Sequence, residues 1–568
     1  MSLAYKSLDI REPAQSLLSR NLKQALEVAR NRIMVGIVFV AFIMCVITFR
    51  LFSIMVLHNG MDENATAMAG GFCPMGRGNI LDRNGEILAT SISTSSLYAN
   101  AKKILDAKAA AKQIRTVLPQ LDEKKLVEKL TSGKRFVWLF RHLTPQQQKK
   151  ILDLGVPGIS FMGDQRRIYP HAQLFSHVVG LTDVDNVGLG GVEKTFDQHL
   201  RQNGQDLTLS LDLRVQHIVR SSLQEGIARF SATGGTAVVM DLETSEVLGM
   251  VSAPDFNPNK NVDVRSPDFF NRATLGMYEM GSTMKIANTA MALESGKVHL
   301  GSVFDTSAPM NIGKFSITDY RANHGVINVA QIFVHSSNKG SARMALAAGL
   351  QHQQNFLKKL GFLEPSRLEL PEYGRPLFPK HWREANQMTI AYGYGISLSP
   401  LHLLNGVASI VGGGCKKRAT LMKLDESAPQ TCERVVSPET SKTMLQLMRF
   451  VVTDGTSKKA NIPGYFVAAK TGTRNILVNG HYRKDRVATS FVGIIGDSQD
   501  KPKYMVVVLL EDPKASKETY GFTTAGWNAA PIGGMILGKV ASLMSVKPTV
   551  EPDHITNPFF RNVSFKTP

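Results

Sequence analysis

The longest apolar run of this chain lies in IMVGIVFVAFIMCVITF, residues 33–49, which carries no charge and limits the possible folds more than any other segment. As a helix rising about 1.5 Å per residue it covers roughly 25 Å, and its continuation past Arg50 to Leu57 exceeds a hydrocarbon layer of about 30 Å. Arg50 can extend its guanidinium toward the interface while its aliphatic stem stays in lipid. We therefore expect residues 33–57 to form a single transmembrane helix.

A cleaved signal peptide is the alternative interpretation of this segment. The apolar region of a signal peptide is only about 7–15 residues long, and its cleavage site follows closely. Here the apolar region is longer, and the nearest small-x-small sequence, ATA at residues 65–67, lies well downstream. The sequence favours an uncleaved anchor.

Positive charge is distributed unequally on the two flanks of this segment. Residues 58–76 carry no Lys or Arg, whereas the first 32 residues carry six, namely Lys6, Arg11, Arg20, Lys23, Arg30 and Arg32. Because basic flanks stay in the cytoplasm, we expect a cytoplasmic tail over residues 1–32. The bulk of the chain would then be periplasmic and held to the inner membrane by a single pass, which excludes a soluble cytosolic enzyme.

The composition is that of a globular protein. The chain has 568 residues, 43% hydrophobic and 20% charged, so two or three domains with real cores are expected. A net charge of +19 could indicate nucleic-acid binding, but the basic residues are spread along the chain and no nucleic-acid-binding motif accompanies them. The charge also suits a protein beside an anionic membrane surface, and we expect no nucleic-acid partner.

Four cysteines are too few for a disulfide scaffold. Cys45 lies inside the apolar run, and Cys415 and Cys432 flank the segment CKKRATLMKLDESAPQTC. A disulfide could close this loop in an oxidising compartment. Spacing alone favours two unrelated thiols, and the question stays open at this level.

The pattern beyond residue 58 predicts two domains of α+β type. Residues 58–225 mix short strand-like, helical and turn-rich pieces. Residues 226–550 begin with a strand–turn–strand pattern near 234–259 and continue with largely helical text over 269–360 and 384–412. They end with strand candidates and an apolar helix, at 464–473, 486–496, 503–514 and 529–544. Strands at both ends imply an antiparallel sheet whose first and last strands meet, with the helices as a separate layer and lobe. Residues 551–568 read as a C-terminal tail.

Three short motifs occur in a fixed order: STMK at 282–285, SSN at 336–338 and KTGT at 470–473. This order is typical of penicillin-binding proteins and serine β-lactamases. Ser336 and Lys339 repeat the Ser-x-x-Lys spacing, but no further motif is placed correctly around them. Each motif alone would read as a helix cap, a solvated lysine or a plain loop; together they predict an active site.

The residue types of the first motif explain its chemistry. A serine hydroxyl is a weak nucleophile until a base accepts its proton. Residues three apart on a helix share a face, so Lys285 can reach Ser282. Lys285 must be partly neutral to act as that base, and both burial and a second cation lower a lysine pKa. Lys470 is the expected second cation.

The other two motifs supply the remaining groups. Ser336 can pass a proton between the lysines and the leaving nitrogen, and Asn338 can hold a substrate amide through a donor and an acceptor. Gly472 leaves room for substrate backbone beside its strand. The predicted catalytic residues are Ser282, Lys285, Ser336, Asn338 and Lys470, and the predicted substrate-binding residues are Ser337, Thr471, Gly472 and Thr473. The two threonine hydroxyls would bind a substrate carboxylate, and the backbone N–H groups of Ser282 and Thr473 would form an oxyanion hole.

Longer segments extend the likeness over nearly the whole chain. RGNILDRNGEILA (77–89), RRIYP (166–170) and VGLTDVDNVGLGGVEKTFDQHL (179–200) resemble three boxes in the pedestal of class B penicillin-binding proteins. NRATLGMYEMGSTMK, YGYGISLSPLHLL and IPGYFVAAKTGT resemble the transpeptidase domain of that class. SSN and the form of GLGGVEK are similar to the cell-division, FtsI type. Met280 departs from the usual proline before the glycine, and GLGGVE has glycine where a glutamate is common.

The resemblance implies a fold and an activity. The fold would be an elongated mixed α/β pedestal and a penicillin-binding, serine β-lactamase-like domain with an antiparallel sheet flanked by helices and an all-helical lobe. The activity would be D,D-transpeptidation of peptidoglycan stem peptides ending in D-Ala-D-Ala, with β-lactams acylating Ser282. No metal or organic cofactor is implied, and the isolated His324 and His335 read as structural. Partners would be an FtsW-type glycosyltransferase and other divisome membrane proteins at the septum.

Three rival functions stay open. A β-lactamase would use the same acylation residues but needs a base for deacylation, and no counterpart of the class A glutamate is evident. An elongation-type transpeptidase would work on the lateral wall. A membrane β-lactam sensor or a division scaffold without essential catalysis is the third, although a sensor should have several membrane spans and a cytoplasmic effector.

Overall fold

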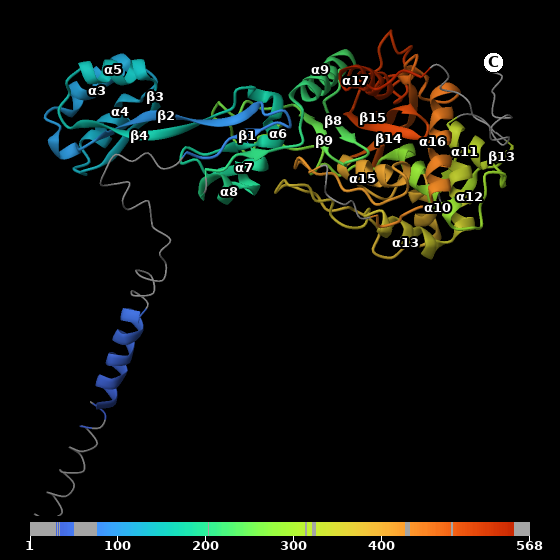
Figure 1. The fold of residues 1–568 in the computed structure, drawn as a ribbon, viewed down its shortest axis with the longest axis horizontal. Coiled ribbons are helices and arrows are strands. Elements are labelled where there is room, and N and C mark those ends of the chain that lie inside the picture. The colour runs from blue at the N-terminus through green and yellow to red at the C-terminus, as the bar shows by residue number, and fades with distance from the viewer. Residues whose placement is uncertain are drawn as a thin grey trace, which may run out of the picture. The chain divides into compact units, whose positions relative to one another are not determined.

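The computed structural model describes residues 30, 32, 34–49, 76–202, 204–312, 315–320, 325–425, 432–478 and 481–549 (Figure 1). The chain divides into two compact units, Met1–Pro74 and Met75–Pro568. In the first unit, residues 34–49 are helical. Among the described residues no helix is both long and apolar enough to cross a membrane. Most of the predicted cytoplasmic tail, residues 50–57 of the predicted anchor and all of the tail at 551–568 lie outside the described residues.

A five-stranded sheet forms the first part of the second unit. Its two short strands are β1 (Ile80–Leu81), which pairs antiparallel with β2 (Ile87–Ala99), and β7 (Leu207–Thr208), which lies parallel to β1. The long strand β2 pairs with β3 (Val137–Leu143) on one side and with β4 (Ile159–Ile168) on the other. Its core side chains alternate along the strands and pack against three helices, α3 (Ala107–Val117), α4 (Glu123–Leu130) and α5 (Pro145–Asp153). Side-chain caps start all three helices, with Asp106, Asp122 and Thr144 accepting backbone N–H bonds.

The three boxes of the pedestal meet at one buried carboxylate. Glu193, on the short helix α7 (Gly191–Thr195), has no solvent exposure. Arg77 Nε donates to its Oε2 at 2.6 Å, and Arg167 Nε donates to its Oε1 at 2.7 Å. Arg77 also donates to Asp197 Oδ1 at 2.7 Å. These residues come from segments 77–89, 166–170 and 179–200, so one ion-pair network joins all three segments.

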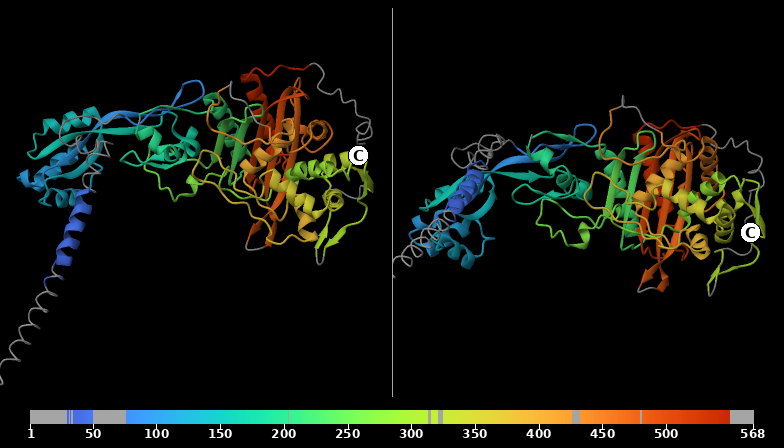
Figure 2. Two further views of the ribbon diagram at one scale, coloured as in Figure 1. Left: turned by 60° about the horizontal axis from the view of Figure 1, so that its bottom comes forward. Right: turned by 90° about the horizontal axis from the view of Figure 1, so that it is seen from below.

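The second domain contains a five-stranded antiparallel sheet in the order β14-β15-β16-β8-β9. Its strands are β8 (Gly234–Asp241), β9 (Val247–Ala253), β14 (Phe466–Val478), β15 (His481–Ser498) and β16 (Lys501–Glu511). β16 pairs with β8, with Val507 opposite Val238. The predicted meeting of the first and last strands is therefore correct, and in both views of Figure 2 the green strands lie beside the orange-to-red ones.

Helices cover both faces of this sheet because its buried strands are apolar on both faces. On one face, α9 (Leu213–Arg229) and α17 (Ala529–Leu543) pack against side chains that include Val239 and Val506. The alternate residues Val238 and Met505 face the other core. That core is built with the helices α10 (Lys285–Glu294), α13 (Leu350–Lys359), α15 (Pro400–Val411) and α16 (Pro438–Thr453). Further helices of the lobe are α11 (Val329–His335), α12 (Asn338–Ala348) and α14 (Glu384–Ile390).

Two local predictions were wrong. Residues 269–360 are not largely helical, because Gly, Pro and β-branched residues between 301 and 328 favour turns and strands. Two small antiparallel pairs form there, β10 (Val303–Asp305) with β13 (Val326–Asn328) and β11 (Met310–Ile312) with β12 (Phe315–Ile317). Cys415 and Cys432, favoured as unrelated thiols, form a disulfide.

Candidate active site

Ser282 lies in a 3-10 turn, Gly281–Met284, and α10 begins directly after it at Lys285. The predicted helix therefore starts three residues later than the motif. Ser282 is half-buried, whereas Lys285 is fully buried. Within the described part of the chain, Ser282 Oγ makes no hydrogen bond. Lys285 Nζ instead donates to Asn338 Oδ1 at 2.7 Å, to Ser336 Oγ at 3.2 Å and to the Ser336 carbonyl.

Ser336 lies between the two lysines of the outer motifs. Its Oγ is 3.2 Å from Lys285 Nζ and 3.0 Å from Lys470 Nζ. Ser336 ends α11 in the left-handed conformation, with φ of 60° and ψ of 40°. A residue other than glycine seldom adopts this conformation, and it tends to persist where function requires it. The turn brings the Ser336 hydroxyl and carbonyl to the buried lysines.

Both lysines lie in an environment that disfavours their charged form. Burial lowers the pKa of Lys285 well below its ordinary value, positive charge on Lys470 lowers it further, and Asp319 opposes the change. Burial lowers the pKa of Lys470 to about 7. The Lys470 ammonium also lies 5.7 Å from the centre of the Phe333 ring. Near neutral pH, Lys285 is thus suited to accept a proton while part of the Lys470 population stays charged.

The SSN motif divides between two roles. Asn338 accepts from Lys285 through Oδ1, and its Nδ2 donates to the Thr318 carbonyl at 3.0 Å. Ser337 differs from the prediction that it binds substrate. It is fully buried, it caps α12 by accepting the Gly340 N–H at 2.9 Å, and its Oγ donates to Asp319 Oδ2 at 2.8 Å. Its contacts are with the chain itself because the motif crosses a tight junction between two helices.

Gly472 has a packing contact that its predicted role did not include. A Cβ built at this residue would lie 2.4 Å from Ser490 Oγ, 2.5 Å from the Met280 carbonyl oxygen and 3.0 Å from the Thr283 nitrogen. Without a side chain at Gly472, β14 and the turn that carries Ser282 approach each other closely.

Hydrogen bonds hold the residue that replaces the usual proline. Met280 is buried, and its carbonyl accepts from Thr283 Oγ1 at 2.8 Å and from Ser490 Oγ at 3.0 Å. The next residue, Gly281, has a positive φ of 56° and donates its N–H to the Gly393 carbonyl at 3.2 Å. These contacts tie the turn to β15 and to the segment after α14.

The threonines of the third motif are partly engaged by the chain itself. Thr471 is buried, and its hydroxyl pairs with the Thr456 hydroxyl at 2.6 Å. Thr473 is half-buried, and its Oγ1 accepts the backbone N–H of Ala525 at 3.0 Å. A hydroxyl that accepts one bond keeps its own proton to donate, so Thr473 can still bind a carboxylate.

Two charged residues beside this strand belong to none of the three motifs. Arg474 follows the KTGT motif directly, and burial lowers the pKa of its guanidinium. Glu279, two residues before Gly281, accepts from Tyr482 OH and from the Gly395 N–H, both at 2.8 Å. Among the described residues, Arg474 Nε and Glu279 Oε2 are buried without a hydrogen-bond partner. Their positions next to the KTGT and STMK motifs were the only indication in the sequence that they lie near the site.

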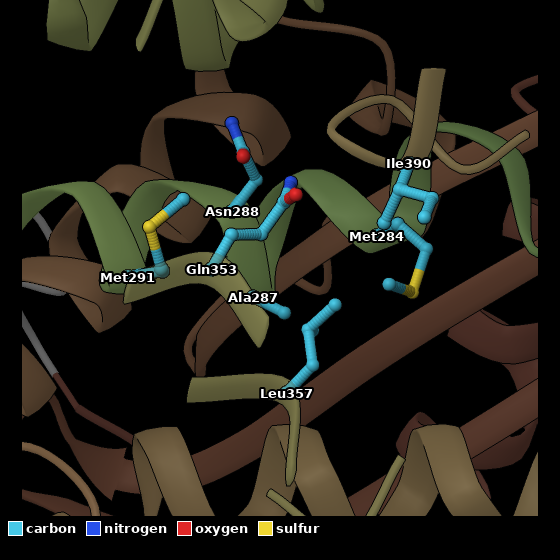
Figure 3. A pocket seen from close by; sticks show the side chains of 7 residues that line it. All are labelled: Met284, Ala287, Asn288, Met291, Gln353, Leu357 and Ile390. Carbon is cyan, nitrogen blue, oxygen red and sulfur yellow. The ribbon is translucent and has the colours of Figure 1, made fainter. Parts of the chain in front are cut away.

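A small cavity beside α10 is not the predicted substrate site. It encloses about 10 Å³, room for at most one water molecule. Figure 3 shows its lining side chains, Met284, Ala287, Asn288, Met291, Gln353, Leu357 and Ile390. None belongs to the predicted site. In the described residues no group of three or more His, Cys, Asp or Glu side chains could hold a metal ion; His324 lies outside those residues.

Comparisons with known proteins agree with this architecture. Residues 235–532 match the penicillin binding protein transpeptidase domain, and residues 73–208 match the penicillin-binding protein dimerisation domain. The chain is 33% identical to the probable peptidoglycan D,D-transpeptidase FtsI of Caulobacter vibrioides, over 85% of this chain and 83% of that protein. It is 31% identical to the peptidoglycan D,D-transpeptidase FtsI of Escherichia coli K12, over 84% and 85%.

A solved structure shows the same fold. The crystal structure of penicillin binding protein 3 from Mycobacterium tuberculosis, complexed with aztreonam, superposes with a TM-score of 0.65 at 24% identity, covering 84% of this chain and 98% of that one. Both domain models match, and two relatives are more than 30% identical over most of both lengths. Together with the common fold, these matches assign the family. The chain belongs to the class B penicillin-binding proteins, the family of peptidoglycan D,D-transpeptidases.

Proposed function

We propose that this chain cross-links peptidoglycan through an acyl-enzyme on Ser282. One observation carries this proposal: Ser336 Oγ lies within hydrogen-bond distance of two fully buried lysines, Lys285 and Lys470. The half-buried Ser282 lies three residues before Lys285, in the turn that packs against β14. Buried amines with lowered pKa values can take up and return a proton near neutral pH, which acyl transfer to and from a hydroxyl requires.

In the first half-reaction, Ser282 Oγ attacks the carbonyl carbon of the penultimate D-Ala of a stem peptide. The hydroxyl proton passes to neutral Lys285. The backbone N–H groups of Ser282 and Thr473 would stabilise the oxyanion of the tetrahedral intermediate. As the peptide C–N bond breaks, a proton reaches the leaving nitrogen through Ser336, and D-Ala departs, leaving an ester on Ser282.

The second half-reaction runs through the same groups in reverse. An amino group of a neighbouring stem peptide attacks the ester carbonyl and loses a proton to the lysine–serine pair. The new peptide bond forms, and Ser282 recovers its proton. Charged Lys470, with the hydroxyls of Thr471 and Thr473, would bind the terminal carboxylate of the donor peptide. Asn338 would contact the peptide amide through its Nδ2, because its Oδ1 is engaged by Lys285.

Mass spectrometry of the intact, detergent-purified chain after benzylpenicillin treatment tests this proposal. We expect one penicilloyl adduct per chain, mapped to Ser282, and none on Ser282→Ala. Incubation with a donor ending in D-Ala-D-Ala should release D-Ala and form a cross-linked product with an amine acceptor. An adduct on another side chain, or no adduct, would overturn the proposed nucleophile.

The chromogenic substrate nitrocefin separates transfer from hydrolysis. A β-lactamase would turn over many equivalents rapidly, because deacylation by water regenerates the serine. A transpeptidase should react with one equivalent of nitrocefin per chain and then stop, because the acyl-enzyme persists. Sustained rapid turnover by the wild-type chain would favour the hydrolase.

We also place this activity at the division septum, on the periplasmic side of the inner membrane. Support comes from the apolar run at 33–57, from the basic residues before it, and from relatives named FtsI. An FtsW-type glycosyltransferase and other divisome membrane proteins would be partners. A fluorescent fusion that labels the lateral wall instead of the septum would favour an elongation role. Complementation of depleted cells by Ser282→Ala would favour a scaffold.

A further inference from the structure

Asp319, which follows the β11–β12 hairpin, accepts hydrogen bonds from the SSN motif. Only 3% of its side chain is exposed. Its Oδ1 accepts the backbone N–H groups of Asn338 at 2.6 Å and of Lys339 at 3.1 Å. Its Oδ2 accepts from Ser337 Oγ at 2.8 Å and lies 4.0 Å from Lys339 Nζ. One carboxylate therefore contacts two consecutive backbone donors and one hydroxyl at the start of α12.

The residue before Asp319 also accepts a hydrogen bond from the motif. The Thr318 carbonyl accepts from Asn338 Nδ2 at 3.0 Å. The same Asn338 accepts from Lys285 Nζ through its other amide atom. A continuous chain of hydrogen bonds thus runs from residues 318–319 through Asn338 to the general base. Because Asn338 has one amide plane, its contact with Thr318 also sets the direction in which Oδ1 meets Lys285.

The carboxylate also contributes charge. It sits at the N-terminal end of α12, where free backbone N–H groups and the helix dipole favour an anion. The ionisable side chains near this junction include Lys285 on α10, Lys470 on β14 and Lys339 on α12. Negative charge on Asp319 favours the ammonium form of Lys285, whereas positive charge on Lys470 favours its neutral form.

We propose that Asp319 is a positioning residue for the transpeptidase reaction, which holds Ser336 and Asn338 against the two lysines. The inference rests on the proposed function, since it assigns Asp319 a role in that same site. Asp319 does not touch the reacting atoms, and it acts through the SSN junction. The sequence motifs do not include it, because it lies 17 residues before Ser336.

The test measures acylation of the full-length chain by a fluorescent penicillin as a function of concentration and pH. Asp319→Asn keeps the size of the side chain but removes its charge and one of its two acceptor atoms. We expect the limiting acylation rate to fall about tenfold or more, with little change in the penicillin concentration that gives half of that rate. Asp319→Glu restores the charge and should recover part of the rate.

The pH profile distinguishes positioning from simple support of the fold. Negative charge on Asp319 favours the ammonium form of Lys285. Its removal should lower the pKa of Lys285 further, so the acid limb of the rate profile should move to lower pH in Asp319→Asn. Asp319→Glu should bring the midpoint back toward the wild-type value. A merely structural role would reduce the rate without moving the midpoint.

Glu294 offers a matched control in the same domain. At the far end of α10, its Oε1 accepts from the N–H of Ser437 at 3.0 Å and from the Ser437 hydroxyl at 2.9 Å, where Ser437 caps α16. Glu294→Gln therefore removes a comparable carboxylate from a helix start that does not carry an active-site motif. We expect its acylation rate and pH midpoint to match the wild type, even if its thermal stability falls as much as that of Asp319→Asn.

Three outcomes would overturn the inference. Equal acylation by Asp319→Asn and the wild type would remove the role altogether. Equal losses in Asp319→Asn and Glu294→Gln, or a loss without a shifted midpoint in both Asp319 variants, would reduce it to general stability. Absence of labelling in the wild-type chain would overturn the proposed function itself, and is thereby distinguished from failure of the Asp319 inference alone.

Discussion

Lys470 Nζ lies 3.0 Å from Ser336 Oγ and joins a strand of the sheet to the junction between α11 and α12. The two residues are separated by 134 positions in the chain. On its other side the same hydroxyl meets Lys285. This relationship makes Ser336 the shared hydrogen-bond partner of the two buried amines, and it leads to the first two predictions.

Replacement of Lys470 by alanine should slow acylation by a fluorescent penicillin by about 10²–10⁴-fold, the contribution expected of a positioned proton-transfer group. Loss of its positive charge should raise the pKa of Lys285, because that charge helps to lower it. The acid limb of the pH–rate profile should therefore move to higher pH, opposite to the shift expected for Asp319→Asn. An unchanged acid limb would mean that the two lysines do not interact as their geometry implies.

Replacement of Lys470 by methionine should stabilise the fold at neutral and acidic pH while abolishing activity. The pKa of Lys470 is about 7 in the folded chain against an ordinary value of 10.5, so the unfolded chain binds more protons between these values and stability rises with pH there. Below about pH 7 the folded state holds a buried cation at full cost. Thermal unfolding should show a gain on the order of 1–3 kcal/mol at pH 7 that fades toward pH 10.5. A loss of stability at pH 7 would contradict this.

Replacement of Gly472 by alanine should push the nucleophile's turn away from β14. Its Cβ would meet Ser490 Oγ and the Met280 carbonyl at 2.4 and 2.5 Å, and such overpacking costs about 1–3 kcal/mol. We expect lower thermal stability and slower acylation together. The matched control is Gly163→Ala, on an exposed part of β4 with no heavy atom within 4 Å of the added carbon and no positive φ; its stability should stay equal or rise slightly.

Removal of the Glu193 carboxylate, as Glu193→Ala, should destabilise the protein by about 3–5 kcal/mol, because it leaves the buried guanidinium groups of Arg77 and Arg167 without their counter-charge. Thermal unfolding of the purified chain measures this loss. The comparison is Glu123→Ala, which breaks an ion pair with Arg115 whose side chains are 38% and 39% exposed. That change should cost less than about 1 kcal/mol. Equal effects of the two substitutions would contradict the assigned network.

Much of the fold was accessible from local patterns. The strands around 234–253 and 466–511 and the helix at 529–543 follow from apolar runs of strand or helix length, and their order implied that β8 and β16 pair. The prediction of a long helical segment was wrong at 303–328, where turn residues and β-branched side chains form short strands instead. The disulfide between Cys415 and Cys432 could not be judged from spacing, since it depends on the distance that folding sets between two loop ends.

The candidate site divides in the same way. The residue types, order and spacing of three motifs predicted Ser282, Lys285 and Lys470 as catalytic residues. Spacing could not tell which side chains of a motif face the site. Ser337 turned out to cap a helix, and Gly472 turned out to accommodate the chain's own turn. Asp319 belongs to no motif, and it became visible only through the hydrogen bonds that converge on it.

By itself, the sequence determined the family of this protein and most of the alternation of its strands and helices, and it predicted the chemical groups of its active site. Each of these follows from motifs and spacings within short segments. Only the tertiary structure showed that the Ser336 hydroxyl lies between the two lysines, that Asp319 hydrogen-bonds to the SSN motif, and that Gly472 allows close packing of the turn. These depend on contacts between separate segments, as between Asp319 and Asn338, 19 positions apart, and between Ser336 and Lys470, 134 positions apart. Burial, which shifts the pKa values of both lysines, exists only once those segments pack together.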